Sequence, residues 1–124
     1  MNAALALLGR VLMSAIFIQG GWGKLMHLSG TSAYMASKGL PLPFVAAIVA
    51  VVVELGGGIA VLIGLRTRIV ALVLAAWCIA TAFIAHYHPD DAGQMIHFMK
   101  NVCMAGGFLV LAAWGAGALS ADRR

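Results

Sequence analysis

Four apolar segments, each long enough to cross a lipid bilayer, alternate with short polar connectors along the chain. A membrane-spanning helix needs roughly 20 predominantly apolar residues to cross a hydrocarbon core of ~30 Å. The segments run from Ala3 to Trp22, from Phe44 to Leu65, from Ile69 to about His86 and from about Met95 to Trp114. This pattern predicts an all-α integral membrane protein: a single domain over residues 1–124, built as a bundle of four transmembrane helices.

The connectors between these segments predict different local structures. The longest, residues 26–43, ends in Gly39-Leu40-Pro41-Leu42-Pro43, which is a strong turn signal. Before that turn, Thr31 to Lys38 is predicted to form a short interfacial helix along the bilayer surface. The turn at residues 65–68 is too short for anything but an antiparallel return. The connector from Tyr87 to Gln94 is predicted to be a solvated turn.

Basic residues are distributed unevenly between the two ends of the predicted bundle. One end has five arginines, namely Arg10, Arg66, Arg68, Arg123 and Arg124. The other end has the lysines Lys24, Lys38 and Lys100, offset by Asp90 and Asp91. Because short cytoplasmic loops are enriched in Lys and Arg, this bias predicts that both termini are cytoplasmic.

The composition supports a membrane protein and argues against a nucleic-acid partner. The chain is 63% hydrophobic and only 10% charged, which is far from the soluble average. The formal charge of +4 is scattered near segment ends, with no basic run, so we expect no nucleic-acid binding. Cys78 and Cys103 both lie inside apolar segments, where small thiols are more typical than a structural disulfide.

Glu54 is the single carboxylate of the second apolar segment and lies near its middle. An ionised group there costs on the order of 3 kcal/mol on insertion scales, so it normally faces protein or a wet cavity. Small residues share its side of the helix, which allows a neighbouring backbone to approach closely. This small face consists of Ala47, Ala50, Glu54, Gly57 and Gly58.

Arg10 is the predicted partner of Glu54. It lies about 12 residues below Trp22, or ~18 Å, while Glu54 lies about 10 residues below Phe44, or ~15 Å, so the two charges are nearly level. Opposite charges at one depth on adjacent helices predict an intramembrane ion pair between Arg10 and Glu54. Two roles stay open for this pair: fixing the register of the helices, or handling a proton or orienting a ligand.

A second group of polar residues is predicted at the outer end of the bundle. His97, Lys100 and Asn101 lie at positions i, i+3 and i+4 of the fourth helix, which places them near one another. With residues of the first and third helices at the same level, they form a candidate ligand-binding cup of Lys24, His86, His97, Lys100 and Asn101. The apolar body beneath it comprises Phe17, Met104 and Phe108. The alternative is that the lysines extend to lipid headgroups.

The remaining histidines and the tryptophans are given no ligand. His86-x-His88 with Asp90 and Asp91 could hold a metal, but alternate histidines in a loop are usually solvated, so no metal site is predicted. The tryptophans are interpreted as interfacial anchors or packing residues rather than as cofactor-stacking groups. They are Trp22, Trp77 and Trp114.

The order of several short motifs along the whole chain resembles that of the DoxX family. The motifs are Arg10, Gly20-x-x-Gly23-Lys24, Gly39-Leu40-Pro41-x-Pro43, Glu54-x-Gly56-Gly57, Gly64-Leu65-x-Thr67-Arg68, His97-Phe98-x-Lys100-Asn101 and Gly115-x-Gly117-x-x-Ser120-x-Asp122. The resemblance implies a multi-pass protein of the bacterial or archaeal cytoplasmic (inner) membrane. The family is named for a subunit associated with a terminal quinol oxidase, and relatives include thiosulfate:quinone oxidoreductase subunits. Its polar positions correspond here to Arg10, Lys24, Glu54, His97, Lys100 and Asn101.

Two functional hypotheses follow. The first is a redox- or quinone-associated accessory subunit, with a quinone bound in the outer half of the bundle and a redox enzyme or a second copy of the chain as partner. The alternative is a non-enzymatic membrane assembly partner or a small-solute carrier. The sequence has no haem-ligand pair across two helices, no flavin or nicotinamide fingerprint and no iron–sulfur cysteine set. We therefore expect no covalent cofactor, and whether the chain catalyses a reaction stays open.

Overall fold

The computed structural model describes residues 2–123, and this part of the chain is helical, without strands. Four helical stretches are long and apolar enough to cross a membrane, which confirms the predicted four-helix membrane fold. The second of these is continuous but contains a π-helical segment in its middle. The elements are α1 (Ala3–Met26), α2 (Leu28–Ser37), α3 (Pro43–Val51), η1 (Val52–Gly56, the π-helix), α4 (Gly57–Ile63), α5 (Thr67–Ala85) and α6 (Ala92–Trp114).

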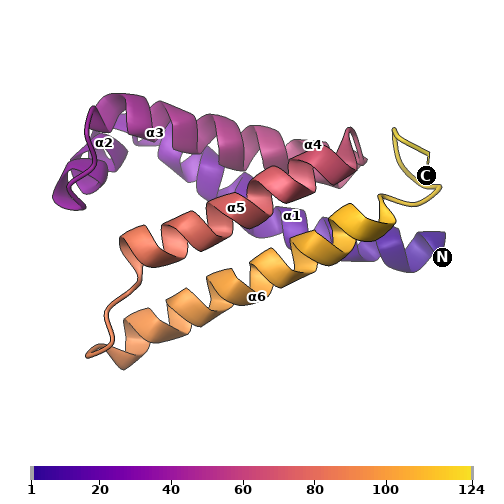
Figure 1. Cartoon of the computed structure of the whole chain (residues 1–124). Helices are drawn as coiled ribbons and strands as arrows, with labels where there is room; N and C mark the ends of the chain where they lie inside the picture. Colours follow the sequence, from indigo (N-terminus) through magenta and orange to yellow (C-terminus); the bar gives the residue numbers. More distant parts are fainter. Residues whose placement is uncertain (1, 124) are drawn as a thin grey trace.

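The helices form two antiparallel pairs. In one pair α1 lies against the continuous span α3–η1–α4, and in the other α5 lies against α6 (Figure 1). Contacts of α4 and η1 with α5 join the two pairs. Both termini lie at the same end of the molecule (Figure 1), which we call the terminal end. The opposite end, with α2 and the α5–α6 connector, is the cup end.

The helices begin and end close to the predicted positions, at residues whose side chains cap a helix or at glycines that end one. Asn2 Oδ1 accepts a hydrogen bond from Leu5 N at the start of α1, and Asp91 Oδ1 accepts one from Gln94 N at the start of α6, as N-cap residues commonly do. Gly64 follows α4 with φ +72°, a left-handed conformation that favours glycine. The first helix continues one turn past Trp22, to Met26.

Small residues bring α1 and the α3–η1–α4 span into close contact, as the small face around Glu54 predicts. Ala47 and Ala50 are fully buried. A Cβ atom at Gly21 would lie 2.5 Å from the backbone nitrogen of Leu55, and one at Gly58 would lie 3.1 Å from that of Ile18. Backbone therefore touches backbone here, which only glycine allows.

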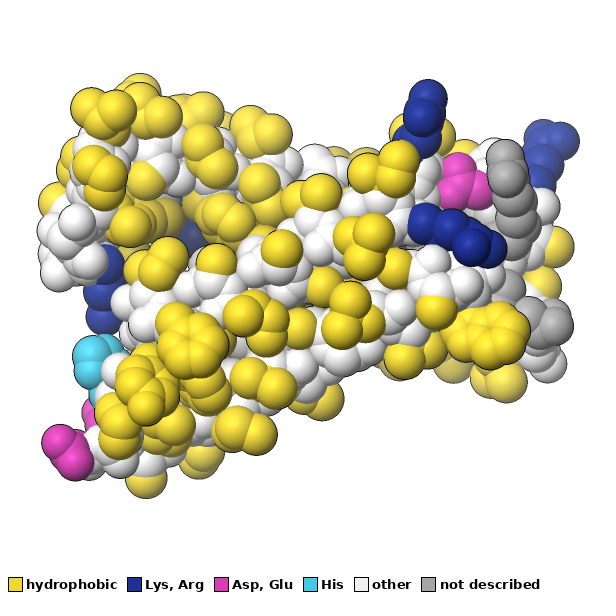
Figure 2. Space-filling view, in the orientation of Figure 1, with side chains coloured by type: hydrophobic (Ala, Val, Ile, Leu, Met, Phe, Trp, Pro, Cys, Tyr) yellow, Lys and Arg dark blue, Asp and Glu magenta, His cyan; other side chains and the backbone are white. Residues whose placement is uncertain are grey.

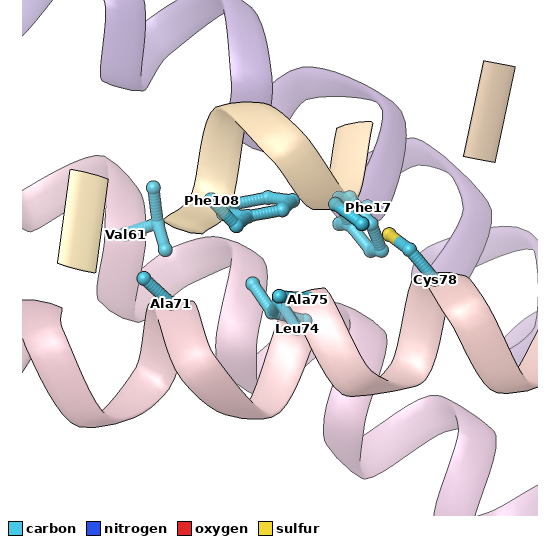
Figure 3. Close-up of a cluster of buried hydrophobic side chains, with 8 residues drawn as sticks. Phe17, Val61, Ala71, Leu74, Ala75, Cys78 and Phe108 are labelled. Carbon is cyan, nitrogen blue, oxygen red and sulfur yellow. The ribbon is translucent and has the colours of Figure 1, made fainter. Parts of the chain in front are cut away.

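A hydrophobic cluster closes the middle of the bundle between the two helix pairs (Figure 3). Phe17 of α1 and Phe108 of α6 meet edge to face, with ring centroids 5.4 Å apart. The other members of the cluster are Val61, Ala71, Leu74, Ala75, Cys78 and Ala105. A smaller cluster of Met35, Ala47 and Ala50 packs α2 onto α3. The predicted short helix is therefore present, and it begins three residues earlier than expected, at Leu28.

The polar tail folds back at the terminal end and forms what we call the C-terminal clasp. Backbone N–H groups of Ala121 and Asp122 donate to the carbonyls of Ile63 and Gly64, both at 2.9 Å. In return, the Asp122 carboxylate accepts hydrogen bonds from the N–H groups of Arg66 and Thr67, each at 2.8 Å. The tail thus caps the N-terminus of α5.

Arg10 holds the same end together from inside. Its guanidinium is almost completely buried and donates to three backbone carbonyls. These are Val61 O at 3.2 Å and Leu62 O at 2.8 Å, both near the end of α4, and Leu119 O in the tail. Arg10 therefore joins α1, α4 and the C-terminal clasp.

Candidate functional site

Glu54 is paired with Lys24 and not with Arg10. Lys24 Nζ lies 2.9 Å from Glu54 Oε1, whereas Arg10 is bonded to carbonyls at the terminal end. The predicted ion pair between Arg10 and Glu54 is therefore wrong.

The error lies in the assumption that Trp22 and Phe44 stand at the same level. The contact of Gly21 with Leu55 makes Trp22 level with Glu54 instead. Phe44 lies 10 residues from Glu54 along the same helix, or about 15 Å toward the cup end. That extra length is covered by α2, which packs on α3.

Trp77 of α5 supplies a second partner for the carboxylate. Its indole Nε1 donates to Glu54 Oε2 across 3.2 Å, so each carboxylate oxygen has one donor. Glu54 is 9% exposed, and a carboxylate buried within a bilayer is destabilising unless such partners compensate its charge. The sequence pattern predicted only an anchoring or packing role for Trp77 and not this hydrogen bond to Glu54.

The carboxylate lies in the middle of the π-helical segment η1. A π turn widens the helix by one residue and is found frequently at functional sites. Glu54 is followed by Gly56, Gly57 and Gly58, and glycine lowers the resistance of a helix to such a change of pitch. The run of glycines is the signal in the sequence that could have indicated an irregular turn.

Lys24 and Glu54 line a cavity of about 460 Å³ at the cup end, between the two helix pairs. Its walls are mostly apolar and include Phe17, Met35 and Met104. The polar side chains that line it are Lys24, Tyr34, Lys38, Glu54, Trp77, Thr81, His86 and Asn101.

Three of the five predicted cup residues line this cavity: Lys24, His86 and Asn101. His97 is not among its lining residues, although its ring centroid lies 5.3 Å from that of His86. Lys100 borders a separate groove along the exposed side of α6. Successive helix residues are rotated by about 100°, so the face that turns Asn101 toward α5 turns Lys100 away from it.

Hydrogen bonds fix several of the lining side chains. Asn101 Nδ2 donates to Thr81 Oγ1 at 3.0 Å, and that hydroxyl in turn donates to the carbonyl of Trp77 at 2.8 Å. His86 Nδ1 and Gln94 Oε1 share a hydrogen bond of 2.9 Å. Thr81 was not predicted, and a hydroxyl one turn after Trp77 on an otherwise apolar helix is the signal that could have identified it.

Lys38 is a further lining residue that sequence reasoning placed only in a connector. It follows α2 directly, and its Nζ lies 3.4 Å from the carbonyl of Ala85 at the end of α5. The same ammonium lies 5.4 Å from the ring centroid of Tyr34, within the range of a cation–π contact.

Within residues 2–123, no three His, Cys, Asp or Glu side chains are close enough together to hold a metal ion. Cys78 is buried in the cavity wall, Cys103 is exposed, and both thiols are free.

These features define a multi-pass helical membrane protein with a polar cavity near one end. The family model for DoxX matches residues 5–87, and the chain belongs to the DoxX family. It is 44% identical over 125 residues to inner membrane protein YphA of Escherichia coli (strain K12), and the aligned region covers 97% of this chain and 89% of that protein. It is also 43% identical over 120 residues to inner membrane protein YqjF of the same strain, over 94% of this chain and 88% of that protein.

These relatives also establish the location of the chain. With four candidate spans and relatives named as inner membrane proteins, it is a multi-pass bacterial inner-membrane protein in contact with the lipid bilayer. A partial match, 42% identical over 69 residues, covers 56% of this chain and 50% of the protein named "Putative oxidoreductase CatD" in Bacillus subtilis (strain 168). No solved structure matches the chain.

Proposed function

We propose that the cavity at the cup end binds a small quinone, and that the protein serves as a quinone-associated accessory subunit of a membrane redox enzyme. The observation that carries the proposal is the contact of Glu54 with Lys24 and Trp77 inside a mostly apolar cavity. An ordered polar cluster in an apolar pocket is the usual arrangement of a small-molecule site.

The size and chemistry of the cavity fit such a ligand. Its volume of about 460 Å³ falls within the roughly 300–1,000 Å³ typical of ligand sites. Quinone oxygens accept hydrogen bonds, and donors are available because an ammonium has three protons and an amide nitrogen two. Lys24 donates one of its protons to Glu54, and Asn101 donates one of its amide protons to Thr81. The other protons of both groups remain available to a ligand. Phe17 and Met104 would contact the ring.

A solute carrier is the competing function. The cavity is closed toward the terminal end by the contact of Phe17 with Phe108, and beyond that by the bonds of Arg10 and the C-terminal clasp. This closure favours a binding site over a passage. The partial similarity to a protein named as an oxidoreductase supports the redox association.

The quinone content of the purified protein tests the proposal. Protein extracted from the inner membrane in mild detergent is expected to retain quinone, measured by solvent extraction and chromatography. Asn101→Leu removes a donor from the cavity and leaves Lys24 and Glu54 in place, so retained quinone should fall about tenfold, the equivalent of one good hydrogen bond.

Lys100→Met is the matched control, because it changes a polar residue of the same helix that borders the separate groove. Its quinone content should equal that of the wild type. Equal retention by Asn101→Leu and the wild type, with both proteins folded by thermal melting, would refute quinone binding in this cavity.

A further inference from the structure

The cavity has more positive than negative charge among its lining residues. Lys24 and Lys38 are its two basic side chains, and Glu54 is its one carboxylate. The remaining titratable residues along the wall are Tyr34, Cys78 and His86, none of which is a carboxylate. When His86 is neutral the lining has a net charge of +1.

Lys38 is the cation without a carboxylate. Within residues 2–123 the ion pair at this site joins Lys24 to Glu54, and the contacts of Lys38 Nζ are the Ala85 carbonyl and the Tyr34 ring. Both contacts hold the ammonium in place at the cavity, but neither neutralises its charge. The Lys38 side chain is half-buried, so its ammonium remains available to an anion that enters the cavity, and such an anion would form a charge-assisted hydrogen bond with it.

We propose that the cavity selects quinone-like ligands whose polar head has one negative charge, with the Lys38 ammonium as the group that binds the anionic oxygen. This inference rests on the proposed function and specifies its ligand class: a ring-hydroxylated quinone, whose hydroxyl group ionises at neutral pH, rather than a neutral quinone. The aromatic ring lies among the apolar walls, and Glu54 stays paired with Lys24.

A phospholipid could supply the same chemistry, because its phosphate is also an anionic oxygen on an apolar body. The two sources differ in how they respond to lipid composition. A headgroup would occupy the site whenever anionic lipid is present, whereas a small acid would bind in a bilayer of purely zwitterionic lipid.

A matched pair of compounds tests the charge preference. 2-Hydroxy-3-methyl-1,4-naphthoquinone is ionised at neutral pH, while 2,3-dimethyl-1,4-naphthoquinone has the same ring and nearly the same size but is neutral. Binding is measured by equilibrium dialysis against the full chain in phosphatidylcholine nanodiscs, with empty nanodiscs as the blank. The ionised compound is expected to bind about tenfold more tightly than the neutral one, the effect of one charge-assisted hydrogen bond.

Three variants assign the preference to Lys38. Lys38→Gln should reduce the affinity for the ionised compound about tenfold and leave the neutral one unchanged, and Lys38→Arg should keep the preference because it keeps the charge. Lys100→Gln, on the outer side of α6, should behave as the wild type. Equal affinities for the two compounds, or a Lys38→Gln variant that keeps the preference, would overturn the inference.

The outcomes separate this inference from the proposed function. If both compounds bind equally well, the cavity is a quinone site without charge selection, and only the inference fails. If neither compound binds, the proposed function fails with it. If phosphatidylglycerol added to the nanodiscs displaces the ionised compound in proportion to its content, the anion of this site is a lipid headgroup and the inference is also wrong.

Discussion

Glu54 shows how a carboxylate is accommodated within a membrane helix. Insertion of an acid near the centre of a bilayer costs on the order of 3 kcal/mol, and two contacts offset this cost: an ammonium at 2.9 Å and an indole N–H at 3.2 Å. Lys24 also lies close to the end of α1. Its aliphatic chain can therefore pack against apolar side chains while its ammonium group stays in the cavity. The side chain of Lys24 is 31% exposed, against 11% for that of Glu54.

The contact between these two residues is expected to stabilise the fold, and a double-mutant cycle measures by how much. Lys24→Gln and Glu54→Gln should each lower the free energy of unfolding by about 2 kcal/mol. That is less than the roughly 3–5 kcal/mol for breaking a fully buried pair, because Lys24 reaches the open part of the cavity. The double variant should lose less than the sum of the two, by about 1 kcal/mol.

Unfolding in mixed detergent micelles, followed by the far-ultraviolet circular dichroism of the helices, gives these energies. Lys100→Gln serves as the control, because Lys100 is exposed on α6. Strict additivity of the two substitutions would show that the ion pair contributes nothing to stability.

At the scale of the helices, the closest approach between α1 and the α3–η1–α4 span sets the geometry of the site. Gly21 touches the backbone of Leu55, the residue that follows Glu54, and this contact places Lys24 within reach of the carboxylate. A shift of α1 by one turn would move its side chains ~5.4 Å along the axis and separate the pair. The small residues therefore act on the site through the register that they allow.

Gly21→Ala is expected to destabilise the protein by about 1–3 kcal/mol, the cost of inserting a methyl group into a packed interface. The new Cβ atom would lie 2.5 Å from Leu55 N, and a backbone atom cannot move without shifting the helix. Thermal denaturation of the purified protein measures the loss of stability. Quinone content measured on the same samples should fall as well, because the helices around Lys24 are pushed apart.

Gly23→Ala is the matched control, two residues along the same helix, where a Cβ atom would meet nothing within 4 Å. This substitution should be neutral or slightly stabilising, since alanine has the higher helix propensity. Equal melting temperatures for the two variants would contradict the close packing of α1 against η1.

The helices were predictable from the sequence, but the register between them was not. Hydropathy and length locate a membrane helix because the bilayer has a fixed thickness, and the periodicity of small residues identified the buried faces, including those of Ala47 and Ala50. Register depends on one specific contact, that of Gly21 with Leu55. Counting residues from the helix ends cannot reveal this contact, and the count therefore paired Glu54 with Arg10 instead of Lys24.

Partners that come from a distant part of the chain were harder to find than those on the predicted faces. Lys24, His86 and Asn101 were predicted because they lie at one level and on inward faces. Trp77 and Lys38 were missed as site residues, because a tryptophan in a membrane helix is commonly an anchor or packing residue and a lysine near a helix end commonly extends to lipid headgroups. Only the packing of α5 against η1 and of α2 at the cavity shows what these side chains contact.

At the scale of the whole molecule, most of the exposed charge lies near the two ends. Figure 2 shows arginine or lysine side chains and an acidic one at the end that holds the termini, and histidine, acidic and arginine or lysine side chains at the other end, with a mostly hydrophobic surface between them. At the terminal end the C-terminal clasp joins Asp122 to the backbone of Arg66 and Thr67. This clasp holds the α4–α5 turn and the tail on the same side of the membrane.

The basic terminal end is expected to face the cytoplasm. Arg66 and Arg68 lie in the short turn before α5 and in its first residues, and Arg123 lies in the tail, so these arginines lie within the short range in which positive charge sets orientation. At the cup end, Asp90 and Asp91 partly offset the lysines. Single cysteines at positions 68 and 91, placed in a Cys78→Ala/Cys103→Ser background, can be probed in intact cells with a membrane-impermeant maleimide.

A cysteine at position 91 should be labelled in intact cells, because the residues around it form an exposed turn that the predicted orientation places outside. A cysteine at position 68 should be labelled only after the inner membrane is permeabilised. Labelling of position 68 in intact cells, with position 91 protected until permeabilisation, would reverse the orientation. In that case the cavity would open toward the cytoplasm, and its ligand would come from the cytoplasmic side rather than from the outer one.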